Sequence, residues 1–142
     1  MVYDLSVPEC EELLRHERVG RLAVRDGEGA YVVPITYAFA DGAIYGHAPM
    51  GKKIRLMRQW PQVSFQVDTI INLSTWRSVL VRGLFEELRD EAGTFRARSL
   101  LVRASGGSLW GATSGHGHAT SLADAVLFRI RAVEITGRAQ NH

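Results

Sequence analysis

Two adjacent lysines, Lys52 and Lys53, follow Gly51 at the start of a short predicted helix, where cations are unfavourable. A helix N-terminus carries roughly half a positive charge, so each lysine there costs about 0.3–1 kcal/mol. The unpaired N–H groups of the first helical turn favour an anion, and a glycine lets the main chain approach a ligand closely. The segment predicts a bound phosphate or similar anion. A solvated helix end is the alternative, and the sequence leaves both open.

Two further segments carry side chains that suit a ligand. His47 stands at the end of a predicted strand, where it would either contact a ligand or hydrogen-bond locally. Ser74–Ser78 combines hydroxyl groups with the ring of Trp76 and the guanidinium of Arg77, a set that suits a planar ligand with polar edges. The alternative places Trp76 in the core and Arg77 in a surface ion pair.

Several known kinds of site are missing from the sequence. The loop Trp110–His118 holds His116 and His118, but no cysteine or suitably spaced carboxylate accompanies them, so no metal is predicted. The two lysines lack the spaced glycine and the hydroxyl residue of a P-loop, and no Gly-x-Gly-x-x-Gly follows a strand. A nucleophile elbow and a His-Glu-x-x-His helix are also missing. The pattern therefore points away from a protein nucleophile.

Short helices and strands must position these residues. Ser6 and Glu9 form a capping box before the first helix, and Asp41-Gly42 suits a type I′ hairpin turn. The predicted helices are Val7–His16, Lys53–Trp60 and Glu91–Ala104. The predicted strands are Val19–Val24, Ala30–Ala40, Ala43–Gly46, Gln62–Asp68, Ser78–Glu87 and Ala125–Ile135, with Gly83 at a bulge. Hairpin connections favour a mainly β (α+β) fold, a small antiparallel barrel with flanking helices.

Length and composition fit one domain over residues 1–142 with a single core. The 17 Lys and Arg against 15 Asp and Glu give a net charge of +2, which gives little support to nucleic-acid binding. Cys10 is the only cysteine, so no intrachain disulfide is possible. No signal peptide or long apolar span is apparent, so we expect a cytoplasmic protein without membrane contact.

Four segments, in order along the chain, resemble the pyridoxamine 5′-phosphate oxidase-like flavoproteins: Val32–Phe39, Tyr45–Asp68, Trp76–Leu88 and Phe128–Arg138. Within that superfamily, the chain is most similar to the short flavin nucleotide-binding proteins related to nitroimidazole-resistance reductases. The resemblance implies a split β-barrel homodimer with one FMN per subunit in a groove between the subunits.

The resemblance also implies which residues meet the flavin. The phosphate would lie near Lys52, Lys53 and Ile54. The isoalloxazine ring would be lined, largely through main-chain groups, by Pro34, Ile35, Thr36 and Tyr37. His47 would border the groove, and three residues would approach from the adjacent strand: Trp76, Arg77 and Ser78. The loop around Trp110 and His116 would come from the partner subunit.

We therefore expect an FMN-dependent oxidoreductase that passes electrons from a reduced nicotinamide donor to a small acceptor, nitro compounds included. The flavin supplies the redox chemistry, so no catalytic residue is assigned. Oxidation of pyridoxamine phosphate is not expected, because the basic residues and C-terminal segment of the vitamin-B6 oxidases have no obvious equivalent. The alternative is a flavin, haem or deazaflavin binding module without turnover. A nucleic-acid-binding barrel is a third, weaker reading, since basic and aromatic residues are not interleaved.

Overall fold

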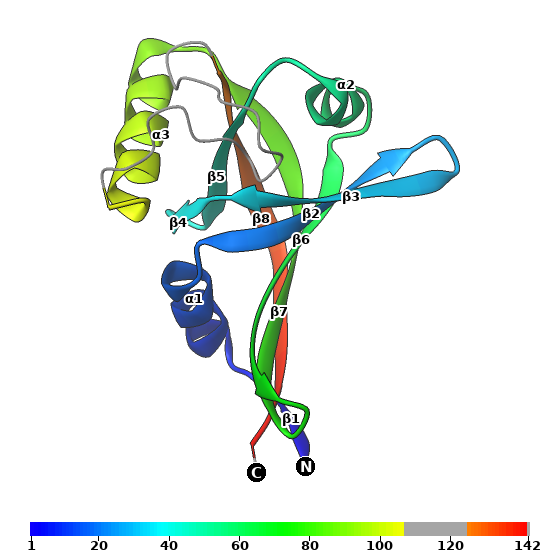
Figure 1. Ribbon diagram of the computed structural model, residues 1–142. Coiled ribbons are helices and arrows are strands. Elements are labelled where there is room, and N and C mark those ends of the chain that lie inside the picture. The colour runs from blue at the N-terminus through cyan, green and yellow to red at the C-terminus, as the bar shows by residue number, and fades with distance from the viewer. Residues whose placement is uncertain (107–124, 142) are drawn as a thin grey trace.

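All strands of the computed structural model, which describes residues 1–106 and 125–141, belong to one antiparallel sheet (Figure 1). The strands are β1 (Val2–Asp4), β2 (Val19–Asp26), β3 (Gly29–Thr36), β4 (Ala38–Ala40), β5 (Ala43–Ala48), β6 (Gln62–Asn72), β7 (Thr75–Leu88) and β8 (Val126–Gln140). The helices of the described residues are α1 (Val7–His16), α2 (Lys52–Gln59) and α3 (Glu91–Ala104).

The strand order is β3-β2-β6-β7-β8-β5-β4, with β1 paired to β8. Figure 1 shows the long β6–β7 hairpin and β8 running down to both chain termini, while the β2–β3 hairpin crosses their upper part. The helices pack around the sheet, with α2 against the β2–β3 side and α3 beside β4 and β5. The predicted mainly β fold with flanking helices is confirmed.

Local sequence signals account for several turns and caps. The predicted capping box is present, since the Ser6 N–H donates to Glu9 Oε1 at 2.8 Å and the Glu9 N–H donates to Ser6 Oγ at 3.3 Å. Asp41 and Gly42 both have positive φ, at 55° and 70°, as a type I′ turn requires. The β7–β8 register shifts between Arg82 and Gly83, which confirms the predicted bulge.

Several predicted strand boundaries are wrong; for example, β8 runs to Gln140, past the predicted end at Ile135. Ala30–Ala40 is not one strand, because the chain turns at Tyr37, whose buried hydroxyl donates to the Leu14 carbonyl at 2.6 Å. β6 and β7 extend past Asp68 and Ser78, since they pair with each other as far as Asn72 and Thr75, although Ile70 and Ile71 are exposed. β1 was not predicted; its three residues are exposed, and pairing with the end of β8 holds them.

The core lies between the inner face of the sheet and the helices. Large buried members of the main cluster are Phe65, Phe128, Leu13, Leu14, Leu22, Ile35, Ile44, Ile54, Met57 and Ile130. Ala97, Leu100 and Leu101 of α3 join a second cluster with Tyr45 and Leu127. No helix within the described residues is both long and apolar enough to cross a membrane.

Candidate functional site

Lys53 is a buried cation at the start of α2. Only 8% of its surface is exposed, and it lies beside the fully buried Ile54. Across residues 1–106 and 125–141, no carboxylate lies within ion-pair distance of its ammonium group. Burial therefore lowers the pKa of Lys53 below the usual lysine value. A lysine held in this way favours a ligand that brings a negative charge.

The N-terminus of α2 adds hydrogen-bond donors beside this lysine. Gly51 is the cap residue, and within the described part of the chain no side chain caps the first turn. The first N–H groups of a helix have no partner within the helix, so an uncapped end can donate to an anion. A Cβ at Gly51 would meet only the Pro49 carbonyl oxygen, at 3.7 Å, so packing around the glycine does not close this end.

Lys52 is placed differently from its neighbour. Its side chain is 54% exposed, and its Nζ lies 3.0 Å from Asp26 Oδ2 at the end of β2. The same ammonium lies 4.8 Å from the centroid of the Tyr31 ring on β3. The sequence alone could not distinguish the two lysines. It also did not point to Asp26 or Tyr31, because their contacts with Lys52 join the β2–β3 hairpin to α2, more than 20 positions along the chain.

The predicted ring-lining segment alternates between the two faces of the sheet. Ile35 and Tyr37 point into the core, whereas Pro34 is exposed and Thr36 half-buried. Tyr37 packs edge-on against Phe65, with ring centroids 4.8 Å apart. Burial, reinforced by the charge of Glu17, raises the pKa of Tyr37 well above its usual value. The side chains of Ile35 and Tyr37 thus fix the strand, and the Tyr37 N–H donates to the Arg18 carbonyl at 3.1 Å.

β3 is an edge strand of the sheet. Its residues Gly29–Thr36 pair with β2 on one side, and no described strand pairs with the other side. Main-chain N–H and C=O groups along such an edge remain available for a ligand or a partner. Pro34 has no N–H, as is common on edge strands, so the edge offers one donor fewer there.

His47 and Ile54 are buried. His47 lies in β5, where all six residues are buried, and it pairs in register with Leu127 of β8. The close approach of the Phe128 ring requires Gly46 before it, because a Cβ at Gly46 would lie 2.6 Å from that ring. Ile54 is fully buried in the core. A ligand at α2 would meet the backbone of Ile54, not its side chain.

Trp76, Arg77 and Ser78 lie at the far end of the sheet from α2. The Trp76 indole N–H donates to Gln140 Oε1 at 3.1 Å, and Ser78 Oγ accepts from Gln66 Nε2 at 3.1 Å. Leu84 of β7 pairs with Gln62, which follows α2. Ser78 precedes Leu84 by six residues, so about 20 Å of strand separates Ser78 from Leu84. Trp76–Ser78 therefore does not reach Lys53 of the same chain.

The sheet register does bring Ser78 near the row of Pro34. Pro34 pairs with Arg21, Arg21 with Gln66, and Gln66 with Leu80, two residues after Ser78.

Trp110 and His116 lie outside the described residues, as does His118. Within residues 1–106 and 125–141, no three His, Cys, Asp or Glu side chains are grouped to hold a metal ion.

The sequence reading also missed a cavity beside Tyr37. It measures about 370 Å³ between α1, β4 and α3, and its lining includes four arginines against one carboxylate: Arg15, Arg18, Arg96, Arg103 and Glu17. A smaller cavity of about 120 Å³ shares Arg18 and Tyr37 with it and reaches Thr36. No spacing in the sequence relates these arginines, because the fold gathers them from segments about 80 residues apart.

Comparison with known proteins places this geometry in a family. The family model for pyridoxamine 5′-phosphate oxidase matches residues 6–139. An uncharacterized protein of Rhizobium meliloti (strain 1021) is 34% identical over 94 residues, which make up 66% of this chain and 62% of that protein. The chain thus matches less than two thirds of that relative's length.

Two solved structures have a similar fold. A FAD-binding protein from Mesorhizobium loti is 37% identical, with a TM-score of 0.84 and 99% of both chains covered. A candidate 5-nitroimidazole antibiotic resistance protein from Bacteroides thetaiotaomicron has a TM-score of 0.74 at 16% identity, with 98% of this chain and 89% of that chain covered. The second likeness concerns the fold alone. The expected split barrel is confirmed, and with 6–139 matched by its model, the chain belongs to the pyridoxamine 5′-phosphate oxidase family.

Proposed function

We propose that this protein binds FMN, with the flavin phosphate at Lys53 and the N-terminus of α2. The observation that carries the proposal is the buried side chain of Lys53, whose ammonium group has no counterion among the described residues. Burying an unpaired charge is costly, and a phosphate would offset that cost with charge-assisted hydrogen bonds. The FAD-binding protein of Mesorhizobium loti, at 37% identity, supports a flavin as the ligand.

The isoalloxazine ring would lie along the outer edge of β3 at Pro34–Thr36. A flavin ring carries donors and acceptors along its edge, and main-chain groups of an edge strand match both kinds. Ile35 and Tyr37 anchor that strand in the core, so the edge is rigid. Bound flavin supplies hydride and electron transfer, and these residues hold and orient it.

The proposed activity is oxidoreduction from a reduced nicotinamide donor to a small acceptor, with nitro compounds among the candidates. The arginine-lined cavity of about 370 Å³ beside Tyr37 has room for a small molecule, and its guanidinium groups would attract an electron-rich or anionic acceptor. A single buried cysteine, Cys10, accords with the cytoplasm as the proposed location.

The proposal includes a homodimer. The outer face of the sheet leaves Val32 and Val133 exposed by 59% and 66%, and a hollow of about 700 Å³ crosses it from Ala30 to Val133. Trp76–Ser78 lies too far along β7 to reach Lys53 of its own chain. A second copy docked on this face would supply those residues to the flavin groove and would cover the apolar side chains.

The visible absorption spectrum of the purified protein tests the proposal. We expect an oxidised flavin spectrum that bleaches on anaerobic addition of a reduced nicotinamide and returns when a nitro compound is added. A flavin spectrum that does not bleach would replace the enzyme with a binding module. A haem spectrum, or a protein that takes up no flavin when FMN is added, would contradict the proposal as a whole.

A further inference from the structure

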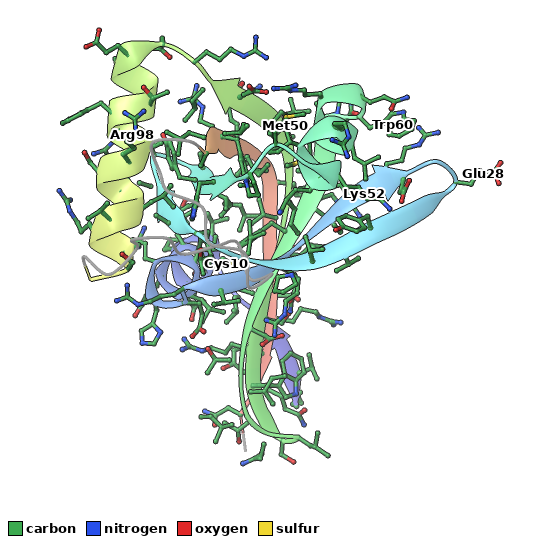
Figure 2. All side chains as sticks on the ribbon, turned by 45° about the horizontal axis from the view of Figure 1, so that its top comes forward. Cys10, Glu28, Met50, Lys52, Trp60 and Arg98 are labelled. Carbon is green, nitrogen blue, oxygen red and sulfur yellow. The ribbon has the colours of Figure 1, made fainter. Side chains whose placement is uncertain are left out.

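A carboxylate stands next to the proposed phosphate site. Asp26 Oδ2 lies 3.0 Å from Lys52 Nζ, and the Tyr31 ring faces the same ammonium at 4.8 Å. Both groups belong to the β2–β3 hairpin, and Figure 2 shows Lys52 between α2 and that hairpin. Asp26 therefore neutralises the lysine that adjoins the buried Lys53.

Other charged groups of the hairpin are directed elsewhere. The Arg25 guanidinium lies 4.8 Å from the centroid of the Trp60 ring and donates to the Gly27 carbonyl at 3.0 Å. Glu28 lies at the tip of the hairpin turn, away from α2 (Figure 2). Within the hairpin, Asp26 is thus the carboxylate that sets the charge beside the lysines.

The charge at the start of α2 follows from these groups. The helix N-terminus and the charged Lys53 together contribute about 1.5 positive charges, because Lys52 and Asp26 cancel. Without the carboxylate, the same end would carry about 2.5 positive charges. The difference matters because flavin nucleotides differ in phosphate charge. The monoester of FMN carries close to two negative charges on one phosphate above its second pKa, near pH 6, whereas FAD spreads the same total over two phosphates, with about one on each.

We propose that Asp26 is a specificity-determining residue: by neutralising Lys52, it keeps the site from favouring the dianionic phosphate of FMN, so that FAD is accepted as well. A site with about 1.5 positive charges lies midway between the two ligands, while one with about 2.5 matches the dianion better. This inference rests on the phosphate site proposed above.

The test is the ratio of FAD to FMN dissociation constants at pH 8 and low salt. Asp26→Asn frees Lys52, so we expect the ratio to shift roughly threefold in favour of FMN, the effect of one extra unit charge at about 6 Å in high dielectric. Lys52→Met leaves Asp26 unpaired and should shift the ratio by a similar factor toward FAD. The double variant should return close to the wild-type ratio.

Two controls separate charge from disturbed folding. Asp41→Asn breaks a similar ion pair, to Arg96 at 3.1 Å on the other side of the molecule, and should leave the ratio unchanged. At pH 5.5 the FMN phosphate is mostly a monoanion, so the FMN preference of Asp26→Asn should shrink.

Other results of these binding measurements would overturn either the role of Asp26 or the phosphate site itself. Equal ratios in all variants, or shifts of Asp26→Asn and Lys52→Met in the same direction, would overturn the role of Asp26. Lys53→Ala distinguishes this failure from that of the proposed function: if it weakens both flavins while the ratios of the other variants stay fixed, only Asp26 is misassigned. If Lys53→Ala binds both flavins as the wild type does, the phosphate site itself is wrong.

Discussion

In two helices of this protein, a basic residue forms an ion pair with an aspartate of a neighbouring hairpin. The residue that follows the basic residue differs between the two helices. In α2, Lys52 pairs with Asp26 of the β2–β3 hairpin at 3.0 Å, and the following residue is the buried Lys53. In α3, Arg96 pairs with Asp41 of the β4–β5 turn at 3.1 Å, and the following residue is the buried Ala97. The residue after the ion pair is thus a buried charge in α2 and a buried methyl group in α3.

The contrast between Lys53 and Ala97 separates a residue kept for function from one kept for stability. Both ion pairs are exposed, and such pairs contribute between about 0 and 1 kcal/mol. A buried alanine is the ordinary solution at the second position, because it fills space without a polar group. A buried lysine without a counterion among residues 1–106 and 125–141 costs stability, which is why we propose a ligand at α2, whereas α3 serves packing.

The largest expected effect comes from making α3 resemble α2. Ala97→Lys places a charge and a longer side chain at a fully buried position of the second core cluster. We expect the free energy of unfolding to fall by about 3 kcal/mol or more. Chemical denaturation measures it. Ala97→Met, of similar length without charge, is the control for size, and an equal loss in both variants would assign the effect to overpacking.

The next effect comes from making α2 resemble α3. Lys53→Ala removes the charge-assisted hydrogen bond that we propose to the flavin phosphate, and such a bond contributes roughly 1.5–3 kcal/mol. We expect FMN to bind about 10 to 100 times more weakly, as measured by fluorescence titration of the flavin. Ile54→Val, the adjacent buried position, should leave FMN affinity nearly unchanged. Wild-type affinity in Lys53→Ala would argue against the phosphate assignment.

A smaller effect is expected on the stability of the flavin-free protein. Lys53→Met removes a buried charge, so the free energy of unfolding at pH 7 should rise by about 1 kcal/mol. Because the pKa of Lys53 is lowered in the folded state, the unfolded chain binds more protons between that pKa and the usual lysine value. Wild-type stability should therefore rise with pH across this window, and the gain from Lys53→Met should shrink. Denaturation at pH 7 to 10 measures both. A variant less stable than the wild type at pH 7 would show that the charge is not destabilising.

The smallest effect compares the two ion pairs. Asp26→Asn and Asp41→Asn should each change the free energy of unfolding by less than about 1 kcal/mol, because both pairs are exposed. Thermal denaturation at low and high salt measures this, and the difference from the wild type should shrink as salt screens the pairs. A loss of several kcal/mol in either variant would show that the pair fastens its helix more strongly than exposure suggests.

Local patterns predicted most of the fold, and long-range pairing supplied the rest. The boundaries of α1 and α3, the Asp41-Gly42 turn and the Gly83 bulge follow from caps, turn residues and periodicity. The extension of β6 and β7 could not be predicted, because exposed Ile70 and Ile71 do not alternate with polar residues and are held by pairing.

The candidate site was predicted only in part, for the same reason. The misplaced lysines are a local signal, so the sequence led to the start of α2. Their different roles depend on Asp26 and Tyr31, which reach Lys52 only after the β2–β3 hairpin folds beside α2. The arginines of the cavity beside Tyr37 come from α1 and α3, so no spacing in the sequence could relate them.

The central claim is that Lys53 holds the flavin phosphate, and the most direct test compares FMN with riboflavin, which has the same ring without the phosphate. The wild-type protein should bind FMN at least 10 times more tightly than riboflavin, since a charge-assisted hydrogen bond contributes roughly 1.5–3 kcal/mol. In Lys53→Met, most of that preference should disappear while riboflavin affinity stays the same. An undiminished preference for FMN in Lys53→Met would contradict the claim.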